Sequence, residues 1–295
     1  MSHFSTVSSD NLKEPNLLII GQGDIGLAVT NRLAEQQVKV TGLARGEKHA
    51  YDLHQRAHYI QADALKLTAD QIKDFTHIAI IVTPDTYEAD NYKNTYLGIA
   101  QHIAELQSQL PQLTRVVFIS STGVYGQDNG EWIDETVEPQ LPKREASQYI
   151  LRAEQVLQQA YGNRAIIIRP SGIYGKQRLM RVRKAKEAEK QPMPRYAWTN
   201  RIMDSDLVTI ITRILTLSKS EELKPIYLAT DYAPVTSFEL TTWLATQLNS
   251  TAPSIKPSDT TETQPTGKRL HSNIPRDWLQ FPDWQSGYSH ILQSK

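Results

Sequence analysis

The chain has 295 residues, 39% of them hydrophobic, so it can bury one large core or two unequal ones. Its 32 basic and 32 acidic side chains cancel, which leaves no overall field to attract nucleic acid or a membrane surface. It contains no cysteine, which excludes disulfides, thiolate metal sites and a cysteine nucleophile. No apolar run reaches the length of a membrane span, and residues 1–15 lack the apolar segment of a signal peptide. We therefore expect a cytoplasmic monomer or homodimer with a small-molecule partner and a loose tail over residues 1–15.

Residues 16–20 (Asn-Leu-Leu-Ile-Ile) form a short apolar run that predicts a buried strand. Three glycines follow with the spacing G-x-G-x-x-G, and a helical pattern of Ile25, Val29 and Leu33 begins at once. Such glycines allow a tight turn, close approach of a pyrophosphate, and contact between helix and strand, so that the helix N-terminus faces the phosphates. The pattern predicts a dinucleotide site made by Gly21, Gln22, Gly23, Asp24, Ile25 and Gly26.

Residues 38–43 predict the second strand, and Ala44-Arg45-Gly46 follow it. NAD-specific sites place an acidic side chain at the end of this strand, where it binds the ribose hydroxyls. Here the first acid is Glu47, and Arg45 occupies the position of the acid. An arginine there suits the 2′-phosphate of NADP, whereas the alternative interpretation is a solvated loop residue. We favour NADP, with NAD as the other cofactor to consider.

Two further strands end near the expected cofactor. Residues 59–63 predict a strand that ends in Asp63, a position that commonly contacts the adenine ring. Residues 77–84 predict a strand that is apolar on both faces, as a parallel sheet requires. Its end, Val82-Thr83-Pro84, should lie beside the cofactor, because ligands bind at the carboxyl ends of parallel strands.

Histidines 49, 54 and 58 have helical spacing, which fits either a metal site or an exposed helix. The nearby acids are few. We therefore favour the exposed helix and expect no metal.

The next segments continue to alternate between strands and helices. We expect a long helix over about 87–110, a strand over 115–120, a helix over about 145–161 and a strand over 165–168. This alternation predicts an α/β fold, a Rossmann-type doubly wound parallel sheet over residues 16–175, to which 201–230 return.

The sequence changes in character after Gly175. Residues 176–195 carry eight basic side chains, at positions 176, 178, 181, 183, 184, 186, 190 and 195, against Glu187 and Glu189. They form either a solvated helix with paired charges or a wall that faces an anionic substrate. We assign residues 176–200 and 231–295 to a smaller substrate-binding region.

Four more elements are expected in this part of the chain. A helix begins near residue 204, capped by Asp204 or Asp206. We expect a strand over 226–229, a helix over 237–248, and a mobile loop over 251–266 that is rich in Ser, Thr and Pro. Three aromatic residues near the C-terminus should pack against the core, namely Trp278, Phe281 and Trp284.

Several sequence motifs together resemble those of the extended short-chain dehydrogenase/reductase family, which includes the NAD-dependent epimerase/dehydratases. They are residues 21–26, 120–126 (Ser-Ser-Thr-Gly-Val-Tyr-Gly), 169–175 (Arg-Pro-Ser-Gly-Ile-Tyr-Gly) and 200–207 (Asn-Arg-Ile-Met-Asp-Ser-Asp-Leu). Residues 281–288 resemble the close of an atypical bacterial branch. The resemblance covers nearly the whole chain from Asn16 and implies the fold and a nicotinamide cofactor. We assign Ser120 and Pro170 to the same cofactor site.

One departure puts the family reaction in question. The family uses a tyrosine with a lysine four residues later, and no tyrosine in this chain has that partner. The family spacing places Ala146 and Ile150 at these two positions, although Ser121 matches the hydroxyl that holds the substrate oxygen. The substitute proton donors that we weigh most are Tyr149, one helical turn from Ala146, and Tyr125 at a strand end.

Three functions follow as alternatives. The first is an NADP-dependent oxidoreductase or epimerase-like enzyme on an anionic or nucleotide-linked small molecule, with Ser121, Tyr149 and Tyr125 as candidate catalytic residues. The second is a non-catalytic protein that senses NADP(H) through the same pocket. The third is a structural subunit with a vestigial site, which predicts no affinity for the cofactor. We favour the enzyme.

Overall fold

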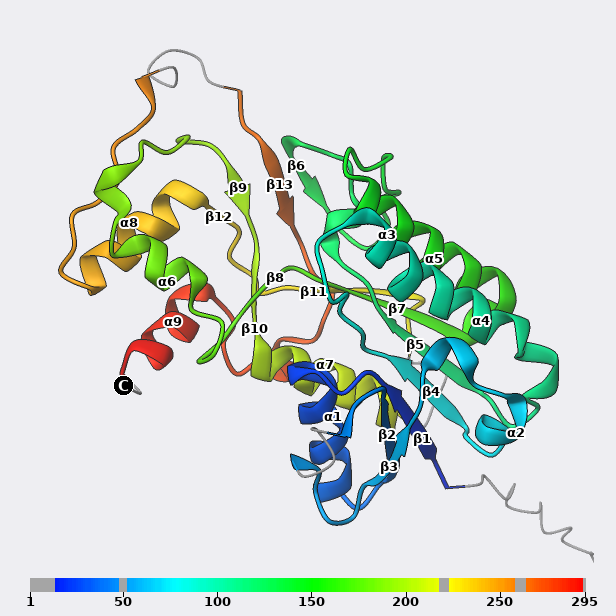
Figure 1. Cartoon of the computed structure of the whole chain (residues 1–295). Helices are drawn as coiled ribbons and strands as arrows, with labels where there is room; N and C mark the ends of the chain where they lie inside the picture. The colour runs from blue at the N-terminus through cyan, green and yellow to red at the C-terminus, as the bar shows by residue number, and fades with distance from the viewer. Residues whose placement is uncertain (1–13, 48–51, 218–222, 258–263, 294–295) are drawn as a thin grey trace, which may run out of the picture.

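A seven-stranded parallel sheet forms the centre of the molecule, with the strand order β11-β7-β5-β4-β1-β2-β3 (Figure 1). The computed structural model describes residues 14–47, 52–217, 223–257 and 264–293. Its strands are β1 (Asn16–Ile20), β2 (Lys39–Ala44), β3 (His58–Gln61), β4 (His77–Ile80), β5 (Arg115–Ile119), β7 (Ala165–Pro170) and β11 (Ile226–Ala229). All neighbouring pairs are parallel, which confirms the predicted doubly wound fold.

Helices cover both faces of this sheet (Figure 1). One face carries α1 (Asp24–Glu35) and α7 (Asp204–Thr216), and the other carries α3 (Ala89–Tyr92), α4 (Ile99–Glu105) and α5 (Glu145–Tyr161). Leu17 and Ile19 therefore belong to one core cluster, and Leu18 and Ile20 to the other. Burial on both faces explains why the central strands are continuously apolar.

Two helices show how well local patterns predict these elements. Helix α5 begins and ends at the predicted residues, and Gly162 with a φ of 56° follows its last turn. The helix expected over 87–110 is instead α3, a π-helical stretch (Lys93–Gly98) and α4, and it ends earlier, at Glu105. The π-helical stretch directs Tyr96 and Leu97 into the core.

The helix expected around His54 and His58 is wrong. The His54 N–H donates to the side chain of Asn31, and the Arg56 N–H donates to His54 Nδ1, so these groups make loop contacts instead of helical ones. His58 begins β3. His49 lies outside the described residues.

A second region lies beside the carboxyl ends of the sheet, on the left of Figure 1. Its core cluster includes Tyr174, Val182, Leu240, Trp284 and Tyr288. Three two-stranded pairs and three helices build it: β8 (Gly172–Tyr174) with β10 (Arg201–Met203), β9 (Trp198–Thr199) with β12 (Val235–Thr236), β6 (Asn129–Ile133) with β13 (Gly267–Leu270), α6 (Met180–Ala185), α8 (Ser237–Gln247) and α9 (Trp284–Gln293).

The C-terminal aromatic residues pack as expected, with Phe281 and Trp284 buried and Trp278 partly buried against the sheet cluster. Asp206 does not cap α7, because its carboxylate accepts the N–H groups of Gln280 and Phe281 and so ties the C-terminal segment to this helix. Within the described part of the chain, no helix is both long and apolar enough to cross a membrane.

The predicted loop over 251–266 is described only in part. Residues 251–257 and 264–266 contain two isolated bridges, Met193 with Ile255 and Ala197 with Thr266. Strand β13, which follows this segment, was not expected from the sequence.

Candidate functional site

The three glycines of the turn after β1 have two different roles: two are tightly packed, and one faces open space. Gly21 has a φ of 96°, and a Cβ there would lie 2.2 Å from the Ile81 carbonyl oxygen. A Cβ on Gly26 would lie 1.9 Å from the Gly21 carbonyl oxygen, whereas one on Gly23 would meet nothing within 4 Å. Gly21 and Gly26 therefore hold strand and helix together, and Gly23 leaves room for a ligand at the N-terminus of α1.

Two side chains of this turn point away from that open face. Gln22 is buried, and its Nε2 donates to the Ile19 carbonyl at 3.1 Å and to Thr30 Oγ1 at 3.0 Å. Ile25 belongs to the core cluster between the sheet and α1. Only the backbone of these two residues is available for the cofactor contacts predicted from the sequence.

Arg45 meets an acid that the sequence around β2 did not reveal. Its Nη2 donates to both carboxylate oxygens of Asp85, at 2.8 and 2.7 Å, and both side chains are exposed. The hydrogen bond and the charge of Asp85 raise the pKa of Arg45. Asp85 comes directly after Val82-Thr83-Pro84, and Val82 Cγ1 is 3.1 Å from the place of a Cβ on Gly21. The loops after β2 and β4 therefore meet beside the glycine turn.

Asp63 follows β3 as expected, but its carboxylate already has a local partner. Its Oδ1 accepts the Leu65 N–H at 3.0 Å and so caps the short 3₁₀ helix over Ala64–Lys66.

A buried polar network lies beneath the carboxyl ends of β5 and β7. Arg169 donates through Nε and Nη2 to the two carboxylate oxygens of Glu154, at 3.0 and 2.6 Å, and through Nη1 to the Tyr125 hydroxyl at 2.7 Å. The Ser120 hydroxyl donates to the same carboxylate. Tyr125 is only 2% exposed, so its hydroxyl lies within this network and not on an open surface, and its role as a proton donor stays a prediction. The Ser120 side chain likewise faces the network, and Pro170 is buried at the end of β7.

Ser121 begins the turn that follows β5, and a lysine from far along the chain reaches this turn. Ser121 Oγ accepts the Gly123 N–H at 3.0 Å. Lys268 Nζ, from β13, donates to the carbonyls of Tyr125 at 2.5 Å and Thr122 at 3.5 Å. Burial lowers the pKa of Lys268. The site thus gains a cation that no local sequence pattern predicts, since β13 comes near through its pairing with β6, more than one hundred residues away in the chain.

Asn200 explains how β13 is held in place. Its Nδ2 donates to the Lys268 carbonyl and its Oδ1 accepts the Leu270 N–H, both at 2.9 Å. The motif Asn-Arg-Ile-Met pointed to Asn200 in the sequence, but nothing in the sequence indicated that Asn200 binds β13.

Helix α5 has aliphatic residues at the two positions where the family has its tyrosine and lysine, and Tyr149 lies between them. Ala146 and Ile150 are 8% and 4% exposed. Tyr149 donates to Glu145 Oε1 at 2.7 Å, and this hydrogen bond raises the Tyr149 pKa, which makes it a weaker acid. The α5 side chain that approaches the Ser121 turn is Ser147, whose Oγ lies 3.4 Å from the place of a Cβ on Gly123.

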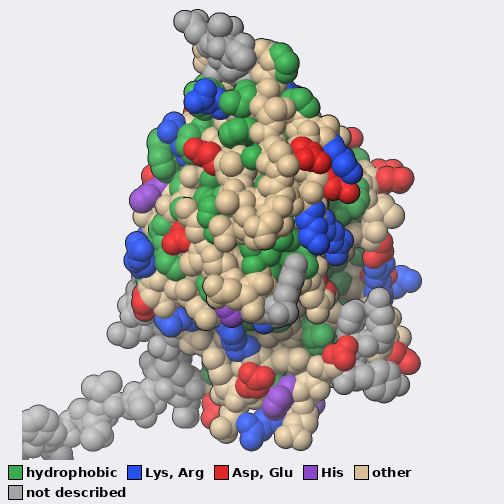
Figure 2. All heavy atoms as spheres, turned by 90° about the vertical axis from the view of Figure 1, so that its left-hand side faces the viewer, with side chains coloured by type: hydrophobic (Ala, Val, Ile, Leu, Met, Phe, Trp, Pro, Cys, Tyr) green, Lys and Arg blue, Asp and Glu red, His purple; other side chains and the backbone are tan. Residues whose placement is uncertain are grey.

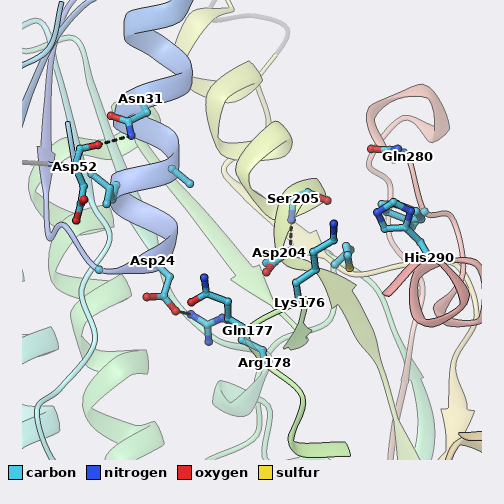
Figure 3. A pocket seen from close by; sticks show the side chains of 15 residues that line it. Asp24, Asn31, Asp52, Lys176, Gln177, Arg178, Asp204, Ser205, Gln280 and His290 are labelled. Carbon is cyan, nitrogen blue, oxygen red and sulfur yellow. Dashed lines mark hydrogen bonds and ion pairs between the residues drawn. The ribbon is translucent and has the colours of Figure 1, made fainter. Parts of the chain in front are cut away.

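A hollow of about 700 Å³ lies between the glycine turn and the second region (Figure 3). Its walls are α1, residues 176–178, the start of α7, and the C-terminal segment with Gln280 and His290. Arg178 and Asp24 point toward one another across its rim, with 3.1 Å between Nη2 and Oδ2. The charge of Asp24 at the helix N-terminus is therefore partly offset where a pyrophosphate would approach.

The basic segment does not form one continuous wall. Lys176 and Arg178 line the hollow, whereas Arg183, Lys184 and Lys186 are exposed outside it. On the face that α6, α8 and α9 form, acidic and basic side chains are intermingled with hydrophobic and other ones (Figure 2). Within the described ranges, no three His, Asp or Glu side chains gather as metal ligands.

Comparisons with known proteins agree with this geometry. The model of the NAD dependent epimerase/dehydratase family matches residues 17–223. A protein from Methylobacillus flagellatus, provisionally named an NAD-dependent epimerase/dehydratase, is similar in structure, with a TM-score of 0.74 and 29% identity over 96% of this chain and 99% of its own. No curated protein sequence matches the chain.

More distant structures share the fold alone. A conserved protein of unknown function from Silicibacter pomeroyi has a TM-score of 0.71 and 20% identity, with 95% of this chain and 99% of that one covered. The UDP-glucuronic acid 4-epimerase from Bacillus cereus, in complex with NAD, has a TM-score of 0.71 and 16% identity, with 94% and 97% covered. Together with the sheet order and the glycine turn, the family match shows that this chain belongs to the NAD-dependent epimerase/dehydratase family.

Proposed function

We propose that the chain binds a nicotinamide dinucleotide at the glycine turn and acts as an oxidoreductase or epimerase-like enzyme on an anionic or nucleotide-linked small molecule. The observation that carries the proposal is the open face at Gly23, because a Cβ there would meet nothing although the neighbouring glycines are tightly packed. Gly23 and the first N–H groups of α1 would hold the pyrophosphate. The bound nicotinamide would accept or supply a hydride.

NADP is the cofactor that we propose. Arg45 is an exposed cation at the end of β2, where it can bind a 2′-phosphate with two parallel hydrogen bonds. Asp85 holds this guanidinium in the structure, so the phosphate would have to take the place of the Asp85 carboxylate. The Asp85 carboxylate also suits the ribose hydroxyls of NAD. The competition between Arg45 and Asp85 therefore decides whether the site prefers NADP or NAD.

The Ser121 turn is the proposed place for the reacting oxygen of the substrate. Ser121 would donate its hydroxyl proton to that oxygen, and Lys268 supplies the cation of the turn. Tyr149 stays a candidate proton donor only if it leaves Glu145, to which its hydroxyl now donates. We propose an anionic substrate on the basis of Lys176 and Arg178 in the hollow beside the glycine turn, whose lining also carries Asp24, Asp52 and Asp204.

A non-catalytic NADP(H) sensor is the second candidate. The specific observation in its favour is that Ala146 and Ile150 are buried aliphatic residues, so α5 offers neither a proton donor nor a cation at the family positions. A sensor and an enzyme would bind the cofactor alike and differ only in turnover.

Thermal unfolding with NADP, NADPH, NAD and NADH tests the shared part of both functions. A nucleotide at one hundred times its dissociation constant should stabilise the fold by about 2.7 kcal/mol. No shift with any of the four would contradict cofactor binding and leave only the structural role.

If NADPH binds, its absorbance during incubation with a panel of carbonyl compounds separates the enzyme from the sensor. Epimerisation recycles the cofactor without net loss of this signal, so UDP-sugars are followed by the appearance of the epimer. Turnover in either assay supports the enzyme, and binding without turnover supports the sensor.

A further inference from the structure

Two arginines, Arg201 and Arg181, have no acidic partner among the described residues. Arg201 of β10 is 5% exposed, and Arg181 of α6 is partly exposed with a buried Nε. Neither Nε has a hydrogen-bond partner, and no carboxylate of the described chain lies within 4.0 Å of either guanidinium. The one side-chain acceptor that Arg201 meets is Thr199 Oγ1, at 2.6 Å from Nη2.

Such an arrangement is costly without a counter-ion. Burial, and then the charge of Arg181, lower the pKa of Arg201 to about 10, so its guanidinium still carries a charge at neutral pH. A buried charge without a partner is strongly unfavourable, because it has lost its hydration and gained nothing in return.

The chain makes room for this guanidinium at the carboxyl end of β7. A Cβ on Gly172 would lie 2.3 Å from Arg201 Nη1, so only glycine allows the side chain to lie there. Ser171, the preceding residue, has a buried hydroxyl without a partner. Ligands of open α/β sheets bind at this edge, beyond the carboxyl ends of the strands.

A tyrosine adds a third unused donor. Tyr288 of α9 is 1% exposed, and its hydroxyl has no partner. Its ring stacks on Tyr174 with 4.3 Å between centroids, and Tyr174 in turn packs on Gly287, where a Cβ would lie 1.9 Å from the Tyr174 hydroxyl. Helix α9, which carries Tyr288, packs against β10, which carries Arg201. Burial raises the pKa of the Tyr288 hydroxyl, and the charges of Arg201 and Arg181 oppose that rise.

One acid faces the cluster from the end of β11. Asp231 Oδ1 accepts the Ala233 N–H at 3.1 Å, and Oδ2 is buried without a partner. Burial raises the pKa of Asp231 well above its usual range, so this residue opposes an anion less than an exposed aspartate would.

We propose that Arg201, Arg181 and the Tyr288 hydroxyl bind an oxyanion, the carboxylate or phosphate group of a small-molecule substrate, at the carboxyl ends of β7 and β11. All three unused groups are donors, which is the complement that an oxyanion requires. The ligand's identity as a substrate rests on the proposed function, but the binding itself does not. Arg181 is partly exposed and is the one of the three groups that solvent reaches most.

Calorimetric titration of the full chain with inorganic phosphate, glucuronic acid, UDP and UDP-glucuronic acid tests the site. Tight binding of UDP without response to glucuronic acid would assign the site to phosphate, and the reverse would assign it to a carboxylate. Arg201→Met should weaken the binding of the responding anion by about 10- to 100-fold, as expected for a lost charged hydrogen bond. Arg183→Met, an exposed arginine of the same helix as Arg181, should leave the affinity within about twofold.

Stability without ligand separates this site from a purely structural arginine. Because Arg201→Met removes an unpaired buried charge, the variant should unfold at the same or a higher temperature than the parent chain. Gly172→Ala keeps the charge but displaces the guanidinium, so it should also lose the anion, and it replaces Arg201→Met if that variant does not fold.

Two outcomes would overturn the inference: none of the four anions binds the parent chain, or Arg201→Met and Gly172→Ala both bind as the parent does. Thermal shifts with NADP and NAD run in parallel on the same proteins. A cofactor shift without anion binding overturns the oxyanion site alone, whereas anion binding that Arg201→Met abolishes supports the site even if no cofactor binds.

Discussion

Two buried arginines show that the two regions of this molecule differ in how completely their buried polar groups are paired. Arg169 lies under the sheet ends, 2% exposed, and every part of its guanidinium meets Glu154 or Tyr125. Arg201, at the junction with the second region, is almost as buried, and among the described residues its guanidinium donates to only one side chain, that of Thr199. The network around Arg169 in the Rossmann half is fully paired, whereas the junction with the second region leaves donors unused. A scaffold is selected for stability, and a binding site keeps unused groups for its ligand.

The largest expected effect breaks the complete network. Glu154→Ala would leave Arg169 buried without its ion partner and should lower the free energy of unfolding by about 3–5 kcal/mol. The double variant with Arg169→Met should recover a large part of this loss, since no charge stays unpaired. Urea unfolding of the three proteins checks this. A loss of less than about 1 kcal/mol for Glu154→Ala would show that the two arginines do not differ as proposed.

The Rossmann half should also make stability depend on pH through His77. This side chain is 8% exposed, and burial together with the charge of Arg115 lowers the pKa of His77 from 6.5 to about 4. The folded state then binds fewer protons than the unfolded chain between these values. Stability is fully present above pH 6.5 and falls by about 3 kcal/mol as the pH drops to about 4.

Chemical unfolding at a series of pH values measures this slope, and His77→Asn is the matched variant. The variant should lose the His77 part of the slope between pH 6.5 and pH 4. An unchanged slope would assign the acid sensitivity to other groups.

Substitutions in the glycine turn test the same distinction between packing and ligand-binding groups, with a smaller expected loss of stability. Gly26→Ala places a Cβ 1.9 Å from the Gly21 carbonyl oxygen and should cost about 2 kcal/mol, because the Cβ is fixed by the helix and the atom that it meets is backbone. Gly23→Ala should cost less than about 1 kcal/mol of stability, since its Cβ would face open space. It should nevertheless weaken cofactor binding as much as Gly26→Ala does. Thermal unfolding with and without NADP separates the two effects. Equal stability losses would contradict the division into packing and ligand-facing glycines.

The smallest effect concerns the exposed pair of Arg45 and Asp85. Asp85→Asn should change the free energy of unfolding by less than about 1 kcal/mol, because exposed ion pairs contribute little. It should raise the affinity for NADP severalfold relative to NAD, because Arg45 no longer has to give up its ion pair with Asp85 in order to bind the 2′-phosphate. Arg45→Asp should reverse the preference toward NAD. An unchanged ratio of NADP to NAD affinity in both variants would contradict the NADP assignment.

Local patterns in the sequence predict much of the Rossmann half. The run of Leu17 to Ile20, the glycine spacing and the amphipathic α5 each depend on neighbours within a few residues, so their periodicity is visible in one chain. The second region was harder to predict. Its strands are two to five residues long, and their partners lie far away, as in the pairing of β13 with β6 across more than one hundred residues.

The same division holds for the functional groups. The sequence by itself determined the fold class, the glycine turn, Arg45, Ser121 and the loss of the tyrosine and lysine pair, because each is a residue type at a local position. Only the tertiary structure decided which groups meet. It turned Tyr125 into the core, brought Asp85 to Arg45 and Lys268 to the Ser121 turn, and left Arg201 without an acid. The physical reason is that charge pairing and burial depend on distances between segments, and one-dimensional spacing does not contain those distances.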